Sequence, residues 1–305
     1  ALMATPVFSQ SASDAAALQS AQADLQSAVK RIAMRPDDAD ALADAGAASL
    51  KLGDPHAALN FYTRASAARP NDGRIVAGLA SATVRTENPF EALRLFDDAL
   101  KLGVPERNIA ADRALAFDLL GNFARAQQDY QMARLSGVTD DLIIHQAVSL
   151  SLLGKFNDAD GMLVPLLQRE VPEAWRARAF MLAARGDYRE ADKVAQGFLD
   201  ADSAEKMDRY FRLMPDLTPA QKSAAIHFGH FPASYDIGHD SEAVRALAAT
   251  IPAPAGAQGD ARLIPSGKPL GPAKTDDKKS KDKRAATAAA DKPVEVARVS
   301  AKKKD

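Results

Sequence analysis

One stretch of the sequence, HFGHFPASYDIGHD, concentrates side chains that could bind a metal ion. It contains His227, His230, Asp236, His239 and Asp240, and two histidines with a carboxylate can coordinate zinc. His227 and His230 also flank a glycine at the expected end of a helix, where histidines commonly bond the last backbone carbonyls. We favour this capping role, expect no bound metal or cofactor, and keep a zinc site as the alternative.

The sequence lacks the common motifs of catalytic and nucleotide-binding sites. It has no phosphate-binding GxxxxGKS/T or GxGxxG loop, no GxSxG nucleophile turn and no HExxH metal motif. The absence of cysteine also excludes disulfides, thiolate metal sites and a cysteine nucleophile. We therefore expect a protein that is not an enzyme.

Charge is distributed unevenly along the chain. From Pro252 onward there are 13 Lys/Arg against 7 Asp/Glu. The chain before Pro252 therefore carries a formal charge of about −7, while the net charge of the whole chain is −1. The basic segment has no aromatic residue, and its lysines alternate with aspartates, which argues against nucleic-acid binding. We expect residues 251–305 to be a disordered Lys/Ala/Pro-rich tail or linker, and contact with an anionic envelope surface is the alternative.

The first residues, ALMATPVFSQSA, resemble the end of a secretory signal, with a cleavage site after Ser9. Residues 1–12 are thus expected to be a signal-peptide remnant, or alternatively a frayed leader. No apolar run approaches the ~20 residues of a membrane-spanning helix. We expect an exported protein of the periplasm or cell envelope, and a cytoplasmic location is the alternative.

A regular spacing of turns organises the elements between these ends. The expected turn positions are Gly53, Glu87, Gly121, Gly154 and Gly186, separated by 34, 34, 33 and 32 residues. An alanine follows each turn by five residues, and a Gly or Ala precedes each turn by seven. Small residues at such positions let two antiparallel helices approach closely, with larger side chains interdigitating around them. The pattern predicts an all-α array of helical hairpins.

This skeleton resembles the tetratricopeptide repeat, a helix-turn-helix unit of about 34 residues, over roughly residues 39–203. The resemblance implies a right-handed superhelical solenoid of about five hairpins. Glu87 departs from it, and we expect Asn88 and Pro89 to make that turn instead.

Helices outside the repeats are expected to complete the solenoid, which we place at residues 13–250. An amphipathic capping helix should precede the first hairpin, beginning near Ser13. Helices at 203–214 and 218–231 should close the far end, and a short helix should follow at 241–249.

Proteins of this family hold peptides on a concave face formed by the first helix of each hairpin, and the resemblance implies such a face here. The candidate partner-binding residues are Arg74, Arg85, Leu115, Asp118, Leu119, Asp141, Ile144, Val148, Leu152, Arg176 and Phe180. Helical spacing does not separate a groove from a core, so packing between neighbouring helices is the alternative for the apolar members.

The expected function is a non-enzymatic scaffold for protein–protein interaction in the bacterial cell envelope. The tail supports an alternative, because Lys/Ala/Pro linkers of this sort resemble those that tether sporulation-related (SPOR) peptidoglycan-binding domains. In that case a C-terminal domain is absent from this sequence, and the protein tethers or contacts peptidoglycan.

Overall fold

The computed structural model of the protein describes residues 12–250. This part of the chain is helical, without strands. The expected tail at 251–305 lies outside the described residues, as does the expected leader except for Ala12. The helices are α1 (Ala12–Met34), α2 (Ala39–Lys51), α3 (Pro55–Ala68), α4 (Gly73–Arg85), α5 (Pro89–Lys101), α6 (Glu106–Leu119), α7 (Phe123–Ala133), α8 (Asp140–Leu152), α9 (Phe156–Gln168), α10 (Pro172–Ala184), α11 (Tyr188–Phe198), α12 (Ala201–Leu213), α13 (Pro219–Phe228) and α14 (Glu242–Thr250), with short 3-10 helices η1 (Arg134–Ser136) and η2 (Met214–Asp216).

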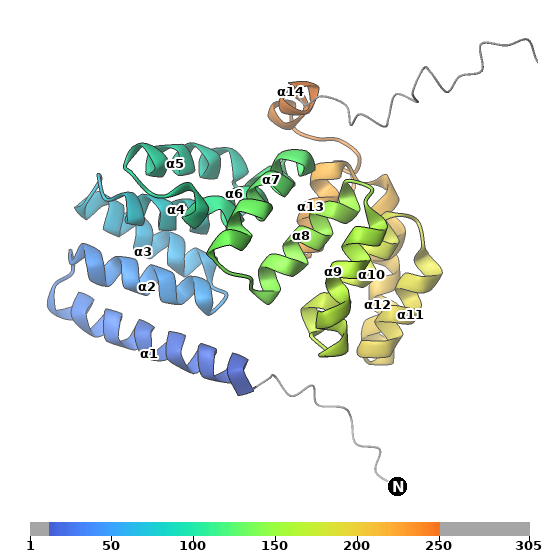
Figure 1. Ribbon diagram of the computed structural model, residues 1–305, viewed down its shortest axis with the longest axis horizontal. Coiled ribbons are helices and arrows are strands. Elements are labelled where there is room, and N and C mark those ends of the chain that lie inside the picture. Colours follow the sequence, from blue (N-terminus) through green and yellow to red (C-terminus); the bar gives the residue numbers. More distant parts are fainter. Residues whose placement is uncertain (1–11, 251–305) are drawn as a thin grey trace, which may run out of the picture. The chain divides into compact units, whose positions relative to one another are not determined.

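Helices α2 to α11 form five consecutive hairpins (Figure 1). Each pair, α2 with α3 through α10 with α11, is joined by a short turn at one of the five predicted positions. Gly53, Gly121, Gly154 and Gly186 adopt positive φ angles between 74° and 91° there, a conformation that glycine reaches without steric cost. The predicted repeat spacing and the all-α architecture are confirmed.

Glu87 makes the second turn in a way that the sequence did not predict. Its own φ is 59°, so a glutamate adopts the left-handed conformation that glycine adopts in the other four turns. Asn88 occupies the N-cap position of α5, but its side chain forms no capping hydrogen bond. The expectation that Asn88 and Pro89 replace the left-handed residue is therefore wrong.

Small residues lie where the paired helices cross. The five alanines that follow the turns, Ala58, Ala92, Ala126, Ala159 and Ala191, have no exposed surface. In the first two hairpins the Tyr62 ring packs against Gly46 and Gly78, where an added Cβ would lie 2.7 Å and 2.2 Å from ring atoms. The close approach of α2, α3 and α4 thus requires glycine at both positions.

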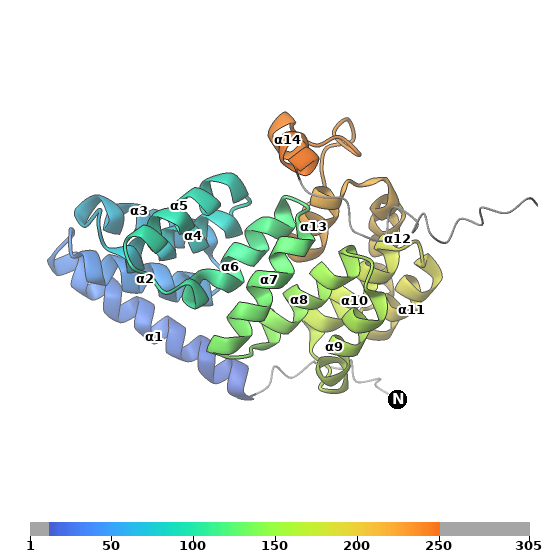
Figure 2. The same ribbon diagram turned by 45° about the horizontal axis from the view of Figure 1, so that its top comes forward.

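Helices outside the hairpins cover the array in two different ways. Helix α1 packs against α2, and α12 packs against α11, as capping helices should. Helix α13 instead contacts α6, α8 and α10, so it does not close the far end (Figure 2). The prediction that this segment is an end cap is wrong in its placement, although a helix forms there. Helix α14 has no buried residue.

Candidate functional site

The first helices of the five hairpins, α2, α4, α6, α8 and α10, contact one another in sequence, and we call the surface they share the inner face. All eleven predicted partner-binding residues lie on these helices. Six of them are buried: Leu115, Asp118, Leu119, Ile144, Val148 and Phe180. The five apolar members of this group pack within the core, which is the alternative that helical spacing left open.

Helix α13 covers this part of the inner face. Ala225 and Ile226 are buried in the same apolar cluster as Val148 and Phe180. On the adjoining cluster, which contains Leu115 and Leu119, Ala224 and Phe228 pack as partly buried side chains. The predicted apolar strip of the third to fifth hairpins therefore exists, but the chain's own helix occupies it.

Asp118 is fully enclosed. Its side chain has no exposed surface, so it does not face a partner in this structure. The Tyr130 hydroxyl donates to Oδ2 at 2.7 Å, and the Ser149 hydroxyl donates to Oδ1 at 2.6 Å. Nε2 of His227, on α13, lies 3.3 Å from Oδ2. Side chains from α6, α7, α8 and α13 thus form one polar cluster between α13 and the repeats.

Burial sets the charge of this cluster. It raises the pKa of Asp118 to about 8, against the opposing effect of the two hydroxyl hydrogen bonds. Desolvation lowers the pKa of His227 to about 3, helped by the positive charge of Arg176. It also lowers the pKa of His145, whose ring meets that of His227 edge-on at 4.9 Å. Burial thus favours the uncharged forms of Asp118, His227 and His145.

The side chains of the histidine-rich stretch point in different directions. Among the described residues, no group of three or more His, Cys, Asp or Glu is placed to hold a metal ion. His227 points into the inner face, so the expectation that it caps the helix is wrong. His230 contacts Glu87 at the α4 turn, and Asp240 accepts a hydrogen bond from Thr218 at 2.6 Å. The stretch fixes α13 and the segment after it.

An open groove of about 550 Å³ lies between α4, the loop from α5 to α6 and the start of α6, and no residue of α13 lines it. Ala77, Gly78 and Ser81 line it from α4, Asn108 and Ile109 line it from α6, and residues 102–105 line it from the loop. Arg74, a predicted partner-binding residue, lines the same groove. The small side chains of α4 leave this part of the inner face uncovered.

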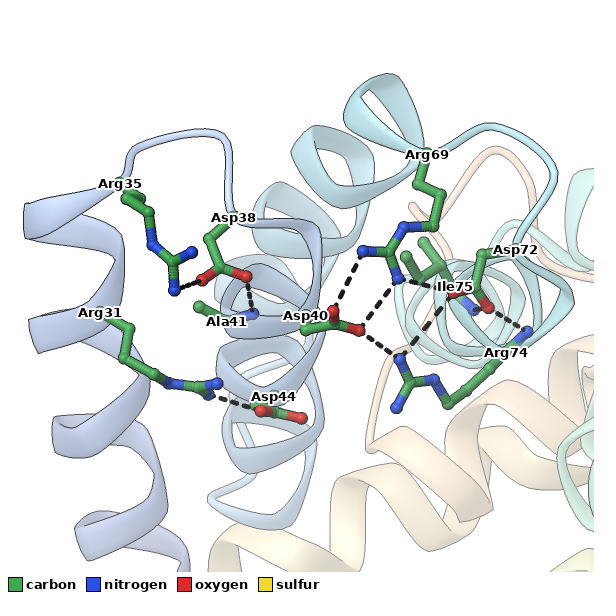
Figure 3. Close-up of polar contacts among 10 residues, drawn as sticks. All are labelled: Arg31, Arg35, Asp38, Asp40, Ala41, Asp44, Arg69, Asp72, Arg74 and Ile75. Carbon is green, nitrogen blue, oxygen red and sulfur yellow. Dashed lines mark hydrogen bonds and ion pairs between the residues drawn. The ribbon is translucent and has the colours of Figure 1, made fainter.

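Arg74, which lines the groove, belongs to a network of paired charges (Figure 3). Asp40 of α2 accepts hydrogen bonds from Arg69 at 3.0 Å and from Arg74 at 2.7 Å, which holds its pKa at about 2. Asp72, which caps α4 by accepting from the Arg74 backbone N–H, also accepts from Arg69. Arg74 is therefore neutralised by its neighbours, and the groove edge has charges of both signs.

The remaining predicted residues are distributed along the inner face. Arg85 donates to Asp112 at 3.0 Å, and Asp141 is exposed in the first turn of α8. Leu152 lines a small pocket of about 150 Å³ beside Pro219 of α13. Arg176 donates to the backbone carbonyl of Ile226 at 3.1 Å, so this predicted residue contacts α13.

Two features of the site were missed by sequence reasoning. One is the partnership of Asp118 with Tyr130, Ser149 and His227, which come from segments distant in the sequence. The other is α13 as the occupant of the inner face. The sequence carries one indication of this packing of α13. Its segment AQKSAAIHF contains paired small residues, which suit close packing against other helices.

Comparisons with known proteins found similarity at the level of structure. No protein-family model matches the sequence, and no curated protein matches it. Among solved structures, a protein described as "YrrB: a TPR protein with an unusual peptide-binding site" is 18% identical, with 61% of this chain and 99% of that chain covered and a TM-score of 0.40.

Two further solved structures are similar to this chain. A tetratricopeptide repeat protein from Parabacteroides merdae is 18% identical over 77% of this chain and 92% of that chain, with a TM-score of 0.44. A structure of Naa15/Naa10 bound to HypK-THB is 16% identical over 77% of this chain and 41% of that chain, with a TM-score of 0.31.

The repeat spacing, the left-handed turns and the small residues at helix crossings decide the assignment. The chain has the fold of tetratricopeptide repeats. Its five repeats are α2–α3, α4–α5, α6–α7, α8–α9 and α10–α11. In the described part of the chain, no helix combines the length and apolarity that crossing a membrane requires.

Proposed function

We propose that the protein is a non-catalytic scaffold that binds a segment of another protein in the open groove between α4 and α6. The observation that supports this proposal most is the groove itself, about 550 Å³ in volume and lined from α4 by Ala77, Gly78 and Ser81. This volume is in the usual range for ligand sites, and side chains this small let a peptide backbone come close to α4.

The charges around the groove fit a peptide better than a small anion. Arg74, which lines the groove, is already paired with Asp40, so it does not offer a free positive charge. A charged side chain of the partner, whether positive or negative, can replace one member of such an ion pair. This fixes the register of the bound segment. Burial of apolar partner side chains over Ala77 and Ile109 supplies affinity.

Ser81→Trp tests this function by filling the groove. Thr63→Trp, on the exposed surface of α3, is the matched control because it adds the same side chain elsewhere. We expect Ser81→Trp to reduce capture of partner proteins by the full chain at least tenfold, and Thr63→Trp to leave it unchanged. Equal capture by both variants, with wild-type helical dichroism, would contradict the proposed groove.

The cell envelope is the proposed location. Its support is the apolar start of the chain, which ends in small polar residues near Ser9. The test is a fusion of the start of the reading frame to a reporter that is active only after export. Reporter activity is expected, and an inactive but intact fusion would place the protein in the cytoplasm.

A tether for a peptidoglycan-binding domain is the second candidate function, and the Lys/Ala/Pro composition of residues 251–305 favours it. Sequencing the complete reading frame tests this candidate. A peptidoglycan-binding domain encoded after Asp305 supports it, and a stop codon directly after Asp305 argues against it.

A further inference from the structure

Helix α13 lies on the inner face as a bound helix would. It crosses α6, α8 and α10, which belong to three successive repeats, instead of continuing the stack beyond α12. The side chains that it buries are Ala220, Ser223, Ala225, Ile226 and His227. This pattern of small residues followed by one large apolar residue is how a helix fits into a shallow groove.

The helix and the segment after it form a unit with its own hydrogen bonds. Thr218 and Gln221 form a capping box at the start of α13. The Gln221 side-chain amide donates to the Asp236 carbonyl at 2.6 Å and to the His239 carbonyl at 3.1 Å, while its oxygen accepts from the Gly238 backbone at 3.0 Å. These bonds stay intact if the unit moves as a whole.

The backbone before α13 can act as the hinge of this unit. Leu217 and Thr218 are extended there. Polar links from this unit to the inner face are few: Arg176 to the Ile226 carbonyl, the 3.3 Å approach of His227 to Asp118, and the contact between His230 and Glu87. Movement of the unit breaks these three links and the apolar contacts of Ala225 and Ile226 with Val148 and Phe180.

The polar fit of α13 to the inner face is incomplete. Among the described residues, neither the buried Ser223 hydroxyl nor the ring nitrogens of His227 have a partner with hydrogen-bond geometry. The 3.3 Å approach of His227 to Asp118 lacks the required alignment. Buried polar atoms without partners weaken the docking of the helix that carries them. A helix with better-placed polar groups therefore binds the same surface more tightly.

We propose that α13 is an internal ligand, and that a helix of a partner protein replaces it on the inner face of the third to fifth repeats. The partner helix has small side chains where α13 has Ala220 and Ser223, a large apolar side chain at the Ile226 position, and an uncharged hydrogen-bonding side chain facing Asp118. Its C-terminal end lies at Arg176, whose positive charge complements the helix dipole.

This site is separate from the groove between α4 and α6, and the inference does not depend on the function proposed there. A displaced α13 exposes Leu119, Val148 and Phe180, residues that the sequence pattern assigns to partner binding. The apolar strip is then a conditional site, available to a partner helix only when α13 leaves.

A labelled peptide with the sequence of residues 217–231 is the probe, and its binding to the full chain is measured by fluorescence anisotropy. In the wild type, tethered α13 competes at a high effective concentration, so binding is weak. Ile226→Asp disfavours docking of α13, and we expect it to bind the peptide at least tenfold more tightly. Leu135→Asp is the matched control, because Leu135 is 82% exposed; it should bind as weakly as the wild type.

Two results would overturn the proposal. One is a folded Ile226→Asp chain that binds the peptide no more tightly than Leu135→Asp does. The other is loss of the helical dichroism in Ile226→Asp, since α13 would then be part of the core that holds the repeats together. Hydrogen exchange of the wild type gives an independent measurement: α13 amides should exchange faster than those of α8, and equal protection also contradicts the proposal.

Discussion

Asp118 shows how one residue couples four helices through burial. Its carboxyl group has no exposed surface and is bonded by hydroxyls from α7 and α8, with a histidine of α13 beside it. A buried carboxylate without a cationic partner at bonding distance is costly, so the native state favours the protonated form. The unfolded chain exposes the same group to water, where its pKa is ordinary.

This difference predicts how stability depends on pH. Asp118, with a native pKa of about 8, stabilises the fold fully below the unfolded pKa near 4 and loses this contribution as the pH rises to 8. His227 and His145 have lowered pKa values, so below about pH 6.5 the unfolded chain gains protons that the native state does not bind. The melting temperature should therefore be highest near pH 6.5.

Asp118→Asn tests the alkaline side of this profile. The amide keeps the shape of the neutral carboxyl group, so we expect near-normal stability at pH 6.5 and little change up to pH 8. The wild type should lose stability over the same interval. Melting curves between pH 5 and 8 measure both, and a wild-type melting temperature that is constant from pH 6.5 to 8 would contradict the assignment.

Arg113 and Asp129 form a second buried polar pair, between α6 and α7. Arg113 donates to Asp129 at 2.6 and 2.8 Å and to Glu106 at 2.6 Å. Asp129→Ala leaves a buried guanidinium with only the exposed Glu106 as a partner, which should cost about 3–5 kcal/mol. Glu106→Gln, the control, should cost less than about 1 kcal/mol. Urea unfolding compares the two, and equal midpoints would refute the difference.

At the scale of elements, the turns between helices limit which residues fit. Glu170, after α9, has a left-handed φ of 57° without being glycine. Glu170→Gly should stabilise the protein by roughly 0.5–1 kcal/mol, because glycine removes the strain of this conformation. Glu205→Gly, at an exposed position within α12, should instead cost about 1 kcal/mol. Thermal unfolding distinguishes the two signs, and destabilisation by both changes would contradict the turn geometry.

Crossing points between helices leave no space for larger side chains. Ala126 is fully buried where α7 meets its neighbours. Ala126→Leu should destabilise by about 1–3 kcal/mol through overpacking. Lys101→Gln, on an exposed side chain of α5, should change little. The midpoints of urea unfolding compare the stabilities of the two variants. Indistinguishable midpoints would contradict the proposed hairpin register.

The sequence predicts the repeats well because their turns and crossings are local. Gly121 and Ala126 are five residues apart, and steric demands within one hairpin fix both. The left-handed conformation of Glu87 could not be predicted. The repeat geometry imposes this positive φ, although a glutamate rarely adopts it. The burial of Leu115 and Val148 also could not be predicted, since helical spacing gives one pattern for a groove and for a covered surface.

At the scale of the whole described molecule, the inner face has two parts. The second and third repeats leave an open groove beside Arg74, while α13 covers the third to fifth repeats. Placing α13 required the structure, because an alanine-rich helix carries little information about which distant surface it packs against. The Asp118 cluster likewise depends on contacts between residues 31 and 109 positions apart in the sequence, Ser149 and His227.

Site-specific photo-cross-linking tests the central claim, that the open inner face binds a segment of another protein. A photoreactive side chain is placed at Ala77 in the groove or at Thr63 on the exposed surface of α3, and each full chain is irradiated in extracts of the cells that make it. We expect discrete adducts with partner proteins from Ala77 and few from Thr63. Absence of adducts from Ala77, or the same adducts from both positions, would contradict it.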